Sequence, residues 1–281
     1  MKRVRVMING LPGKMAEIAA RLIIAERENL LMELVPFSQT GDEIEDGDFR
    51  LGKGVLHLVR ASEMRGYIKT IKDRNFPFIS VDFTAPAAVM PNVRFYCENG
   101  LPFIMGTTGY SEAELAVIKE MVFFADIPAV IAPNMAREIV GLQAMMEFAS
   151  VNFPNLFGEY NLDIVESHQT GKKDTSGTAR AMIKYFNALG MPFDVKHIEM
   201  IRDPQEQGNM GVPKEALAGH GWHTYTWRSG DGTVLFRLTH NVNGRKIYAR
   251  GTISAILFLE SKILAGAKGV FNMIDVIRAG F

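Results

Sequence analysis

Apolar residues in the first half of the chain form short runs with polar or mixed stretches between them. The continuous runs predict buried strands at residues 4–9, 30–35, 55–59, 77–81, 101–105 and 128–132. Between them the pattern predicts helices at residues 15–23, 62–72, 87–98 and 112–124. In the first of these, apolar residues recur every three or four positions. Ser111 and Glu114 have capping-box spacing at the start of the last helix. Strands alternating with helices predict a doubly wound, parallel α/β sheet.

The pattern changes after Asn134. It predicts helices at residues 137–151 and 178–189, and strands at residues 162–165, 197–201, 222–228, 234–240 and 246–250. The turn sequence at residues 229–232 predicts a hairpin between two of these strands. We therefore expect a second α+β domain with a mixed, largely antiparallel sheet at residues 135–250. A helical segment over residues 254–278 is expected to pack back on the first domain, so that residues 1–134 and 251–281 form one dinucleotide-binding domain.

Composition excludes several classes of protein. The 31 basic and 31 acidic side chains give no net charge, so the chain lacks the positive field expected of a nucleic-acid binder. Its one cysteine, Cys97, cannot form an intrachain disulfide, and no run approaches eighteen apolar residues. The chain enters an apolar strand directly after Met1-Lys2-Arg3, without a signal-like segment. We expect no membrane contact and a cytoplasmic location, or the plastid stroma for a processed plant protein.

A glycine turn follows the first predicted strand. In a Rossmann-like sheet this turn would let the backbone approach a pyrophosphate at the helix N-terminus, and its candidate cofactor residues are Gly10, Gly13, Lys14 and Met15. The glycine pattern is incomplete, because Pro12 and Ala16 replace two glycines, so an ordinary glycine-containing turn stays an alternative. Met15 stands where a magnesium-binding Ser or Thr would be in a Walker A loop.

The end of the second strand bears on the choice of cofactor. An acidic residue there usually binds the ribose 2′-hydroxyl of NAD, whereas this chain has no carboxylate before Asp42. Ser38, Gln39 and Lys14 could instead donate hydrogen bonds to a 2′-phosphate. This favours NADPH, with NADH possible; the alternative is that these polar residues begin a solvated loop.

Residues 166–179 combine several groups that can do chemistry. Ser176 and Thr178 lie at a helix start, where Gly177 permits close approach of a carboxylate or phosphate. His168 and Lys172 offer a proton donor and a cation, which suits an anionic substrate that must be protonated. The alternative is a capped helix start preceded by a solvated loop.

The stretch Glu-Ser-His-Gln-Thr-Gly-Lys-Lys-Asp-Thr-Ser-Gly-Thr-Ala at residues 166–179 resembles the signature of the dihydrodipicolinate reductase family. The resemblance extends to the glycine turn, to residues 81–84 and to residues 106–109. Residues 200–204, 211–213 and 240–249 resemble the plant-type branch in particular. Many bacterial members have a second histidine where Gln169 stands and a proline before Ser-Gly-Thr, and this chain has neither.

The resemblance implies hydride transfer from NAD(P)H to 4-hydroxy-tetrahydrodipicolinate, a cyclic dicarboxylate of diaminopimelate and lysine synthesis, or to its dehydrated form. His168 and Lys172 would be the catalytic proton donors. The substrate carboxylates would be held by Gln169, Ser176, Gly177, Thr178 and Arg245. The residues facing the cofactor beyond the glycine turn would be Phe83, Thr84, Gly106, Thr108, Gly109 and Asn134.

Two further expectations concern the second domain. His220 and His223 are three apart in a predicted strand, so they point to opposite faces and no metal site is expected. A strand rich in tryptophan and tyrosine, at residues 222–227, is expected to form a subunit interface in a homotetramer or homodimer. The alternatives to this reductase are another two-domain Rossmann dehydrogenase and a non-catalytic NADPH-binding sensor, and the presence of both His168 and Lys172 argues against the sensor.

Overall fold

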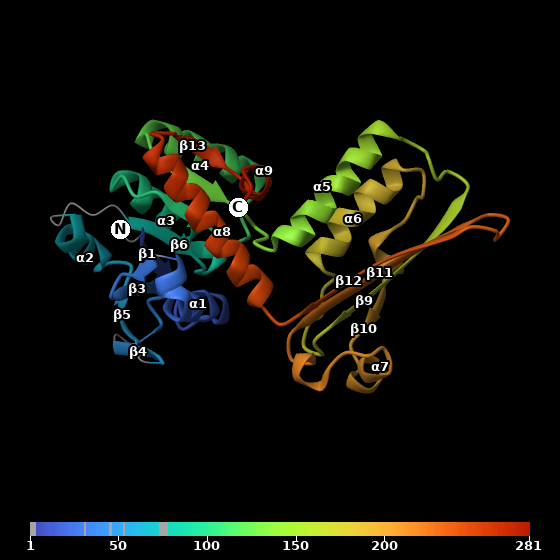
Figure 1. Cartoon of the computed structure of the whole chain (residues 1–281), viewed down its shortest axis with the longest axis horizontal. Coiled ribbons are helices and arrows are strands. Elements are labelled where there is room, and N and C mark those ends of the chain that lie inside the picture. The colour runs from blue at the N-terminus through green and yellow to red at the C-terminus, as the bar shows by residue number, and fades with distance from the viewer. Residues whose placement is uncertain (1–3, 31, 45–46, 53, 73–77) are drawn as a thin grey trace. The chain divides into compact units, whose positions relative to one another are not determined.

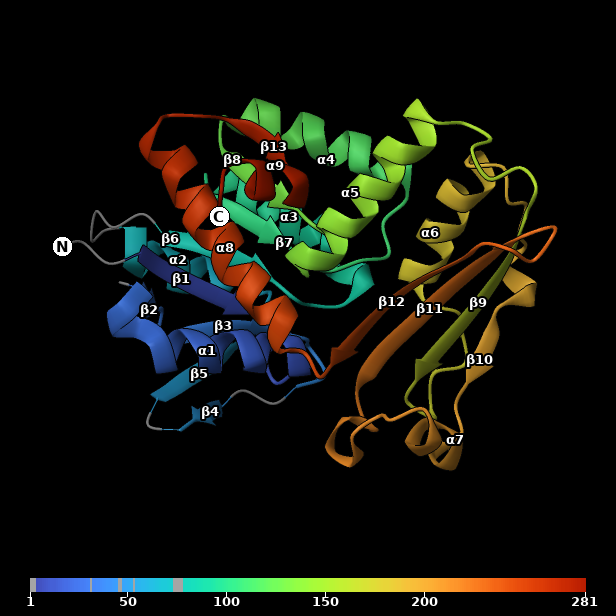
Figure 2. The same ribbon diagram turned by 45° about the vertical axis from the view of Figure 1, so that its right-hand side comes forward.

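The structure is a computed structural model that describes residues 4–30, 32–44, 47–52, 54–72 and 78–281 (Figures 1 and 2). The chain forms two compact units. Unit 1 consists of Met1–Arg137 and Lys246–Phe281, and unit 2 of Glu138–Arg245. Each is described below by itself.

Unit 1 contains a six-stranded sheet in the order β13-β8-β7-β6-β1-β2, in which every neighbouring pair is parallel. This confirms the predicted doubly wound α/β sheet. The strands are β1 (Val4–Asn9), β2 (Met32–Leu34), β6 (Phe78–Asp82), β7 (Phe103–Met105), β8 (Pro128–Ile131) and β13 (Gly269–Phe271). The helices are α1 (Lys14–Leu30), α2 (Met64–Lys72), α3 (Val89–Glu98), α4 (Glu112–Ala125), α8 (Lys246–Leu264) and α9 (Met273–Arg278).

Helices cover both faces of this sheet, and Figure 2 shows α8 in front of it and α4 behind. Every residue of β6, β7 and β8 is buried, which explains why β7 and β8 are apolar throughout rather than alternating, whereas β6 also buries Ser80 and Asp82. Helix α4 begins with the predicted capping box, since Ser111 and Glu114 each bond the backbone of the other. A 3₁₀ turn, Pro86–Ala88, precedes α3.

A separate three-stranded sheet lies beside the end of β1, and it corrects one prediction. It contains β3 (Phe37–Thr40), β5 (Gly54–Arg60) and β4 (Gly47–Leu51), in the order β3-β5-β4. Residues 55–59 are therefore a strand but do not join the parallel sheet. The backbone N–H of Gly10 donates to the carbonyl of Gln39 at 2.8 Å, so the end of β3 continues alongside β1.

Unit 2 packs two helices, α5 (Arg137–Asn152, whose first residue belongs to unit 1) and α6 (Gly177–Ala188), on one face of a mixed sheet (Figure 1). The strand order is β10-β9-β11-β12, with β9–β10 parallel and the other two pairs antiparallel. The predicted second sheet is thus confirmed. The strands are β9 (Tyr160–His168), β10 (Glu199–Ile201), β11 (His220–Ser229) and β12 (Leu235–Asn243). Shorter elements are α7 (Pro204–Asn209) and the 3₁₀ turns Val195–His197 and Lys214–Ala216.

Two predictions about the last third of the chain are wrong. Residues 246–250 are not a strand but the first turns of α8, because Ala249, Ile253 and Ile256 are buried at helical spacing. Residues 254–278 are not one helix, since β13 interrupts them and pairs with β8. Strand β9 is also longer than predicted, which places Glu166, Ser167 and His168 in a strand rather than in a loop.

Candidate active site

The carboxyl ends of β1, β3 and β6 in unit 1 surround a cavity of about 700 Å³. Ligands of open α/β sheets bind at this edge. The lining comes from residues 10–13, 39–44, 83–85 and 87–88, with Ala61, Pro91 and Asn92.

Glycines allow the backbone segments around this cavity to come close together. Gly10 has φ 101°, and a Cβ there would lie 2.3 Å from the carbonyl oxygen of Phe83. A Cβ at Gly106 would lie 2.3 Å from the Phe83 ring. The ends of β1, β6 and β7 can therefore meet at Phe83 only with glycine at both positions.

A buried polar network, which we call the Asp82 cluster, lies next to the cavity and shares Gln39, Thr84 and Asn92 with its lining. It consists of Asp82 with Asn9, Gln39, Thr84, Asn92, Tyr96 and Thr107. The Asp82 carboxylate, which is fully buried, accepts from the Tyr96 hydroxyl and the Asn92 amide at 2.8 Å and from the Thr107 hydroxyl at 2.7 Å. Asn9 accepts from the Gln39 backbone N–H at 3.0 Å. The cluster thus ties β1, β3, β6, β7 and α3 together at the edge where a cofactor would bind.

The predicted cofactor residues fall into two groups. Gly10, Gly13, Phe83 and Thr84 line the cavity. Seven others do not line it. Lys14 is exposed and Met15 half-buried at the start of α1, and Thr108 and Gly109 are exposed after β7. Gly106 packs on Phe83, Asn134 accepts from the Ala136 N–H at 2.9 Å, and Ser38 is fully buried.

The strand segment at Ser38–Thr40 differs from the prediction. Ser38, Gln39 and Thr40 do not begin a solvated loop but form the buried strand β3, and the Ser38 hydroxyl is directed at the Gln39 carbonyl rather than at the cavity. The strand whose end lies beside β1 at the cavity is therefore β3, which ends at Thr40. Asp42 and Glu43 follow it and line the cavity, so carboxylates do stand there.

In unit 2, one face of the sheet changes from apolar to polar along its strands. Cross-strand register places Leu162, Trp227 and Phe236 side by side at one end. Two steps further along this face, Glu166, His223 and His240 are side by side, and Tyr225 lies on the same face two residues after His223. His168 comes last, opposite Gly221, where a Cβ would lie 3.0 Å from the His168 ring. We call Glu166, His168, His223, Tyr225 and His240 the histidine cluster.

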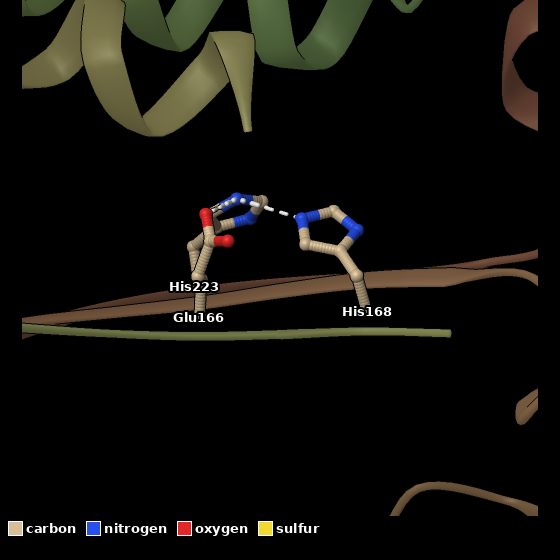
Figure 3. A group of neighbouring side chains, drawn as sticks. All are labelled: Glu166, His168 and His223. Carbon is tan, nitrogen blue, oxygen red and sulfur yellow. Dashed lines mark hydrogen bonds and ion pairs between the residues drawn. The ribbon is translucent and has the colours of Figure 1, made fainter. Parts of the chain in front are cut away.

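His168 has a defined orientation within this cluster. Its Nδ1 lies 2.9 Å from the His220 carbonyl oxygen, which can only accept, so Nδ1 carries a proton. Its Nε2 lies 3.4 Å from Nε2 of His223, a contact drawn as a dashed line in Figure 3. His223 Nε2 also lies 3.8 Å from a Glu166 oxygen. Nε2 of His168 is consequently the atom that gains or loses a proton.

Burial disfavours positive charge throughout this cluster. Burial, reinforced by His240 and His168, lowers the pKa of His223 to about 2, and burial together with His168 lowers that of His240 to about 4. Burial also lowers the pKa of His168, partly offset by the Glu166 carboxylate. Burial raises the pKa of Tyr225 well above its usual value.

The segment between β9 and α6 is held by charged contacts. Glu166 is fully buried; one oxygen accepts from Arg202 at 2.5 Å and the other from the Ser176 backbone N–H at 3.0 Å. Lys172 pairs with Asp174 at 2.8 Å. Ser176 caps α6 by accepting from the Thr178 N–H, and nothing lies within 4 Å of a Cβ at Gly177. Helix geometry leaves the amides of Gly177 and Ala179 without an intrahelical acceptor, so an anion can approach there.

The remaining predicted residues lie in unit 2 as well. Gln169 is half-buried directly after β9, and its carbonyl accepts from the Lys172 N–H. The Arg245 guanidinium lies beside Gly219, 3.4 Å from a Cβ built there. Sequence reasoning missed Glu166, Arg202 and His223 as site residues. Glu166 could have been noticed because it continues the alternation of buried Leu162 and Ile164 along one face of β9, whereas His223 is brought to His168 only by strand register.

The described residues include one group able to offer three ligand atoms to a metal, namely Glu166, His168 and His223, whose ligand atoms lie within 4.8 Å of one another. Arg202 and Ser176 already engage both Glu166 oxygens, and the charges of Arg202 and Lys172 oppose a cation. His220 points to the opposite face, where its Nε2 lies 2.7 Å from the Ser167 hydroxyl. The site is therefore better suited to protons than to a metal ion.

Comparisons with known proteins cover both units. A model of the N-terminus of dihydrodipicolinate reductase matches residues 4–135, and a model of its C-terminus matches residues 139–277. The chain is 41% identical over 280 residues to 4-hydroxy-tetrahydrodipicolinate reductase 1, chloroplastic, of Arabidopsis thaliana, covering 99% of this chain and 78% of the relative. It is 40% identical over 277 residues to a probable chloroplastic reductase 1 of the same name from Oryza sativa subsp. japonica, covering 98% and 79%.

A solved structure of dipicolinate-bound dihydrodipicolinate reductase from Paenisporosarcina sp. TG-14 has the same fold, with a TM-score of 0.65, 22% identity, and coverage of 96% of this chain and 97% of that one. Fold and relatives together define an oxidoreductase. The chain belongs to the dihydrodipicolinate reductase family, as the resemblance predicted. Among the described helices, none is both long and apolar enough to cross a membrane.

Proposed function

We propose that this protein reduces 4-hydroxy-tetrahydrodipicolinate to tetrahydrodipicolinate in diaminopimelate and lysine biosynthesis. The substrate loses its hydroxyl as water and gains a hydride, so one proton is consumed for each nicotinamide oxidised. The observation that carries the proposal is the placement of His168 at the end of β9, with Nδ1 fixed by a carbonyl and Nε2 as the nitrogen that can titrate. His168 comes two residues after Glu166, which accepts from the N-cap of α6. The names of the plant relatives and the dipicolinate-bound bacterial structure support the choice of substrate.

The two units would divide the work. Unit 1 would hold the dinucleotide, because its cavity lies at the carboxyl ends of parallel strands and is lined by Gly10 and Gly13. The nicotinamide, when bound, supplies the hydride. Thr108, Gly109 and Asn134 would contact its nicotinamide end. Unit 2 would bind the dicarboxylate and form the contacts of a homotetramer or homodimer.

His168 would donate the proton through Nε2, since Nδ1 is engaged with the His220 carbonyl. Lys172 would stabilise the negative charge of the substrate once it exchanges Asp174 for a substrate carboxylate. The open N-terminus of α6 would bind one carboxylate. Its contacts would come from Gln169, Ser176, Gly177 and Thr178, with Arg245 for the second carboxylate.

The cofactor proposed from the sequence is NADPH. The structure adds an opposing contribution, because the carboxylates of Asp42 and Glu43 line the cavity and would repel a 2′-phosphate. We expect Asp42→Asn/Glu43→Gln to tighten NADPH binding several-fold more than NADH binding, measured by nicotinamide fluorescence. Equal effects on the two cofactors would place the 2′-phosphate elsewhere.

The deciding assay follows nicotinamide absorbance after freshly made dihydrodipicolinate synthase product is added to the protein with NADPH or NADH. We expect oxidation that depends on this product and stops when the synthase is omitted. Absence of oxidation with both cofactors would refute the proposed activity. The two plant relatives are chloroplastic, which supports the plastid stroma as the location if the source is a plant.

A further inference from the structure

The histidine cluster contains a residue that the proposed reaction does not use. His223 is almost fully buried, stacks on His240 with ring centroids 4.6 Å apart, and directs Nε2 at Nε2 of His168 (Figure 3). Its Nδ1 has no hydrogen-bond partner among the described residues. A buried, half-satisfied imidazole beside the proposed proton donor requires an explanation, because such groups are normally fully hydrogen-bonded.

The two facing nitrogens restrict where protons can lie. At most one proton fits between the two Nε2 atoms, and with none two lone pairs would face each other at 3.4 Å. A hydrogen bond between these atoms therefore has two arrangements. In the first, neutral His223 carries its proton on Nε2 and donates to Nε2 of a neutral His168. In the second, His168 is an imidazolium that donates to His223, whose own proton must then move to Nδ1.

The surroundings favour the first arrangement. In the second, the Nδ1–H of His223 would be buried without an acceptor, a more costly defect than an unprotonated nitrogen without a donor. In the first, the Nε2–H of His223 also faces the Glu166 carboxylate at 3.8 Å. The charged groups around His168 are Glu166 on β9, Lys172 after β9 and Arg202 after β10, and its titratable neighbours are His220 and His223 on β11 and His240 on β12. Burial disfavours the second arrangement, which adds a positive charge, and Glu166 offsets this effect only in part.

We propose that His223 is a positioning residue. Its Nε2–H donates to Nε2 of His168 in the free enzyme and keeps the His168 ring neutral until a dianionic substrate binds and breaks this hydrogen bond. This inference rests on the proposed function for the identity of the substrate. The consequence is that the catalytic proton is not stored in the resting enzyme. It is taken up from solvent together with the substrate, whose two carboxylates favour the imidazolium form of His168.

The first test needs no substitution. Histidine labelled with ¹⁵N reports the tautomer of each ring through long-range ¹⁵N–¹H couplings, and exposed His197 provides an internal reference. In the free protein at pH 7.5 we expect neutral His168 protonated at Nδ1 and neutral His223 protonated at Nε2. His223 protonated at Nδ1 would overturn the proposal.

The second test changes the contact. The oxygen of a glutamine amide can accept from the His168 imidazolium without a tautomer change, so His223→Gln should raise the His168 pKa by about one pH unit. The matched control is His240→Gln, which alters the ring stacked on His223 but leaves the nitrogen pair intact; it should shift that pKa by less than about a third as much. Equal shifts in the two variants would contradict a positioning role for His223.

The third test uses pyridine-2,6-dicarboxylate as an unreactive probe. Calorimetry in two buffers of different ionisation enthalpy should show uptake of about one proton by the unsubstituted protein and less by His223→Gln. No uptake by the unsubstituted protein would overturn the proposal. If the protein fails to reduce the proposed substrate, the proposed activity is wrong, and the tautomers and titrations still decide the role of His223. If the protein is active but the tautomers and titrations differ from these expectations, only the proposed role of His223 is wrong.

Discussion

The Asp82 cluster of unit 1 and the histidine cluster of unit 2 are both largely buried polar groups on strands, yet they are built in opposite ways. In the Asp82 cluster, every buried side-chain polar atom has a partner among the described residues. In the histidine cluster, four atoms have none: Nδ1 of His223, both ring nitrogens of His240 and the Tyr225 hydroxyl. A satisfied network fixes backbone positions, whereas an unsatisfied one leaves room for protons to move. The difference therefore separates a rigid cluster beside the proposed cofactor cavity from the cluster proposed to take part in proton transfer.

The largest effect is expected from removing the centre of the satisfied cluster. Asp82→Ala would leave the Tyr96 hydroxyl, the Asn92 amide and the Thr107 hydroxyl without their acceptor, so the free energy of unfolding should fall by about 4 kcal/mol. Urea denaturation measures this loss. The control is Asp163→Ala at an exposed position of β9, which should change stability by less than about 0.5 kcal/mol. Similar losses in both variants would mean that the Asp82 cluster is not a scaffold.

The next largest effect concerns chemistry rather than stability. His168→Ala should lower kcat about a hundredfold or more, because the proposed general acid is lost, while NADPH affinity and the midpoint of unfolding stay unchanged. Steady-state kinetics and cofactor fluorescence separate these quantities. A fall in cofactor affinity instead would make His168 a structural residue.

Acidity should weaken unit 2 before unit 1. Folding lowers the pKa of His223 to about 2 and that of His240 to about 4, so below pH 6.5 the unfolded chain binds more protons than the folded one. Stability from these two residues is therefore complete above pH 6.5 and falls as the pH drops. The expected loss is about 2 kcal/mol between pH 6.5 and pH 5.5, measured by denaturation at each pH. The double variant His223→Gln/His240→Gln should show a shallower slope; an identical slope would assign the loss to other groups.

The smallest effect gives the cleanest comparison, because two fully buried tyrosines differ only in whether their hydroxyl is bonded. The Tyr96 hydroxyl donates to Asp82 and accepts from Asn9, so Tyr96→Phe should cost about 1–2 kcal/mol of unfolding free energy. The Tyr225 hydroxyl has no partner among the described residues, so Tyr225→Phe should leave stability unchanged or raise it slightly. A loss at Tyr225 equal to that at Tyr96 would remove the distinction between the clusters.

The sequence was informative wherever the signal was local. Buried parallel strands such as β7 and β8 are continuous apolar runs, and the Ser111 capping box needs only three residues of spacing. The segment at residues 166–179 is likewise conspicuous, because its hydroxyls, glycine and charges are adjacent in the chain. For the same reason, the amino-acid sequence alone is enough to make His168 and Lys172 candidates for proton transfer.

What the sequence did not reveal depends on contacts between distant segments. His168 and His223 are 55 positions apart and meet only through the register of β9 with β11. The apolar character of residues 254–278 does not distinguish helix from the edge strand β13, since pairing with β8 decides it. The polar strand Phe37–Thr40 was misjudged because its side chains bond to segments elsewhere in unit 1, such as Gln39 to Asn92.

The late position of β13 affects how the protein is made. All the residues lining the unit 1 cavity precede Arg137, but α8, β13 and α9 complete that unit only after Arg245. During synthesis, unit 2 is finished while the sheet of unit 1 still has β8 as an open edge, which is a template for unwanted pairing. Premature termination after Arg245 would therefore release a chain with an intact histidine cluster and an aggregation-prone unit 1.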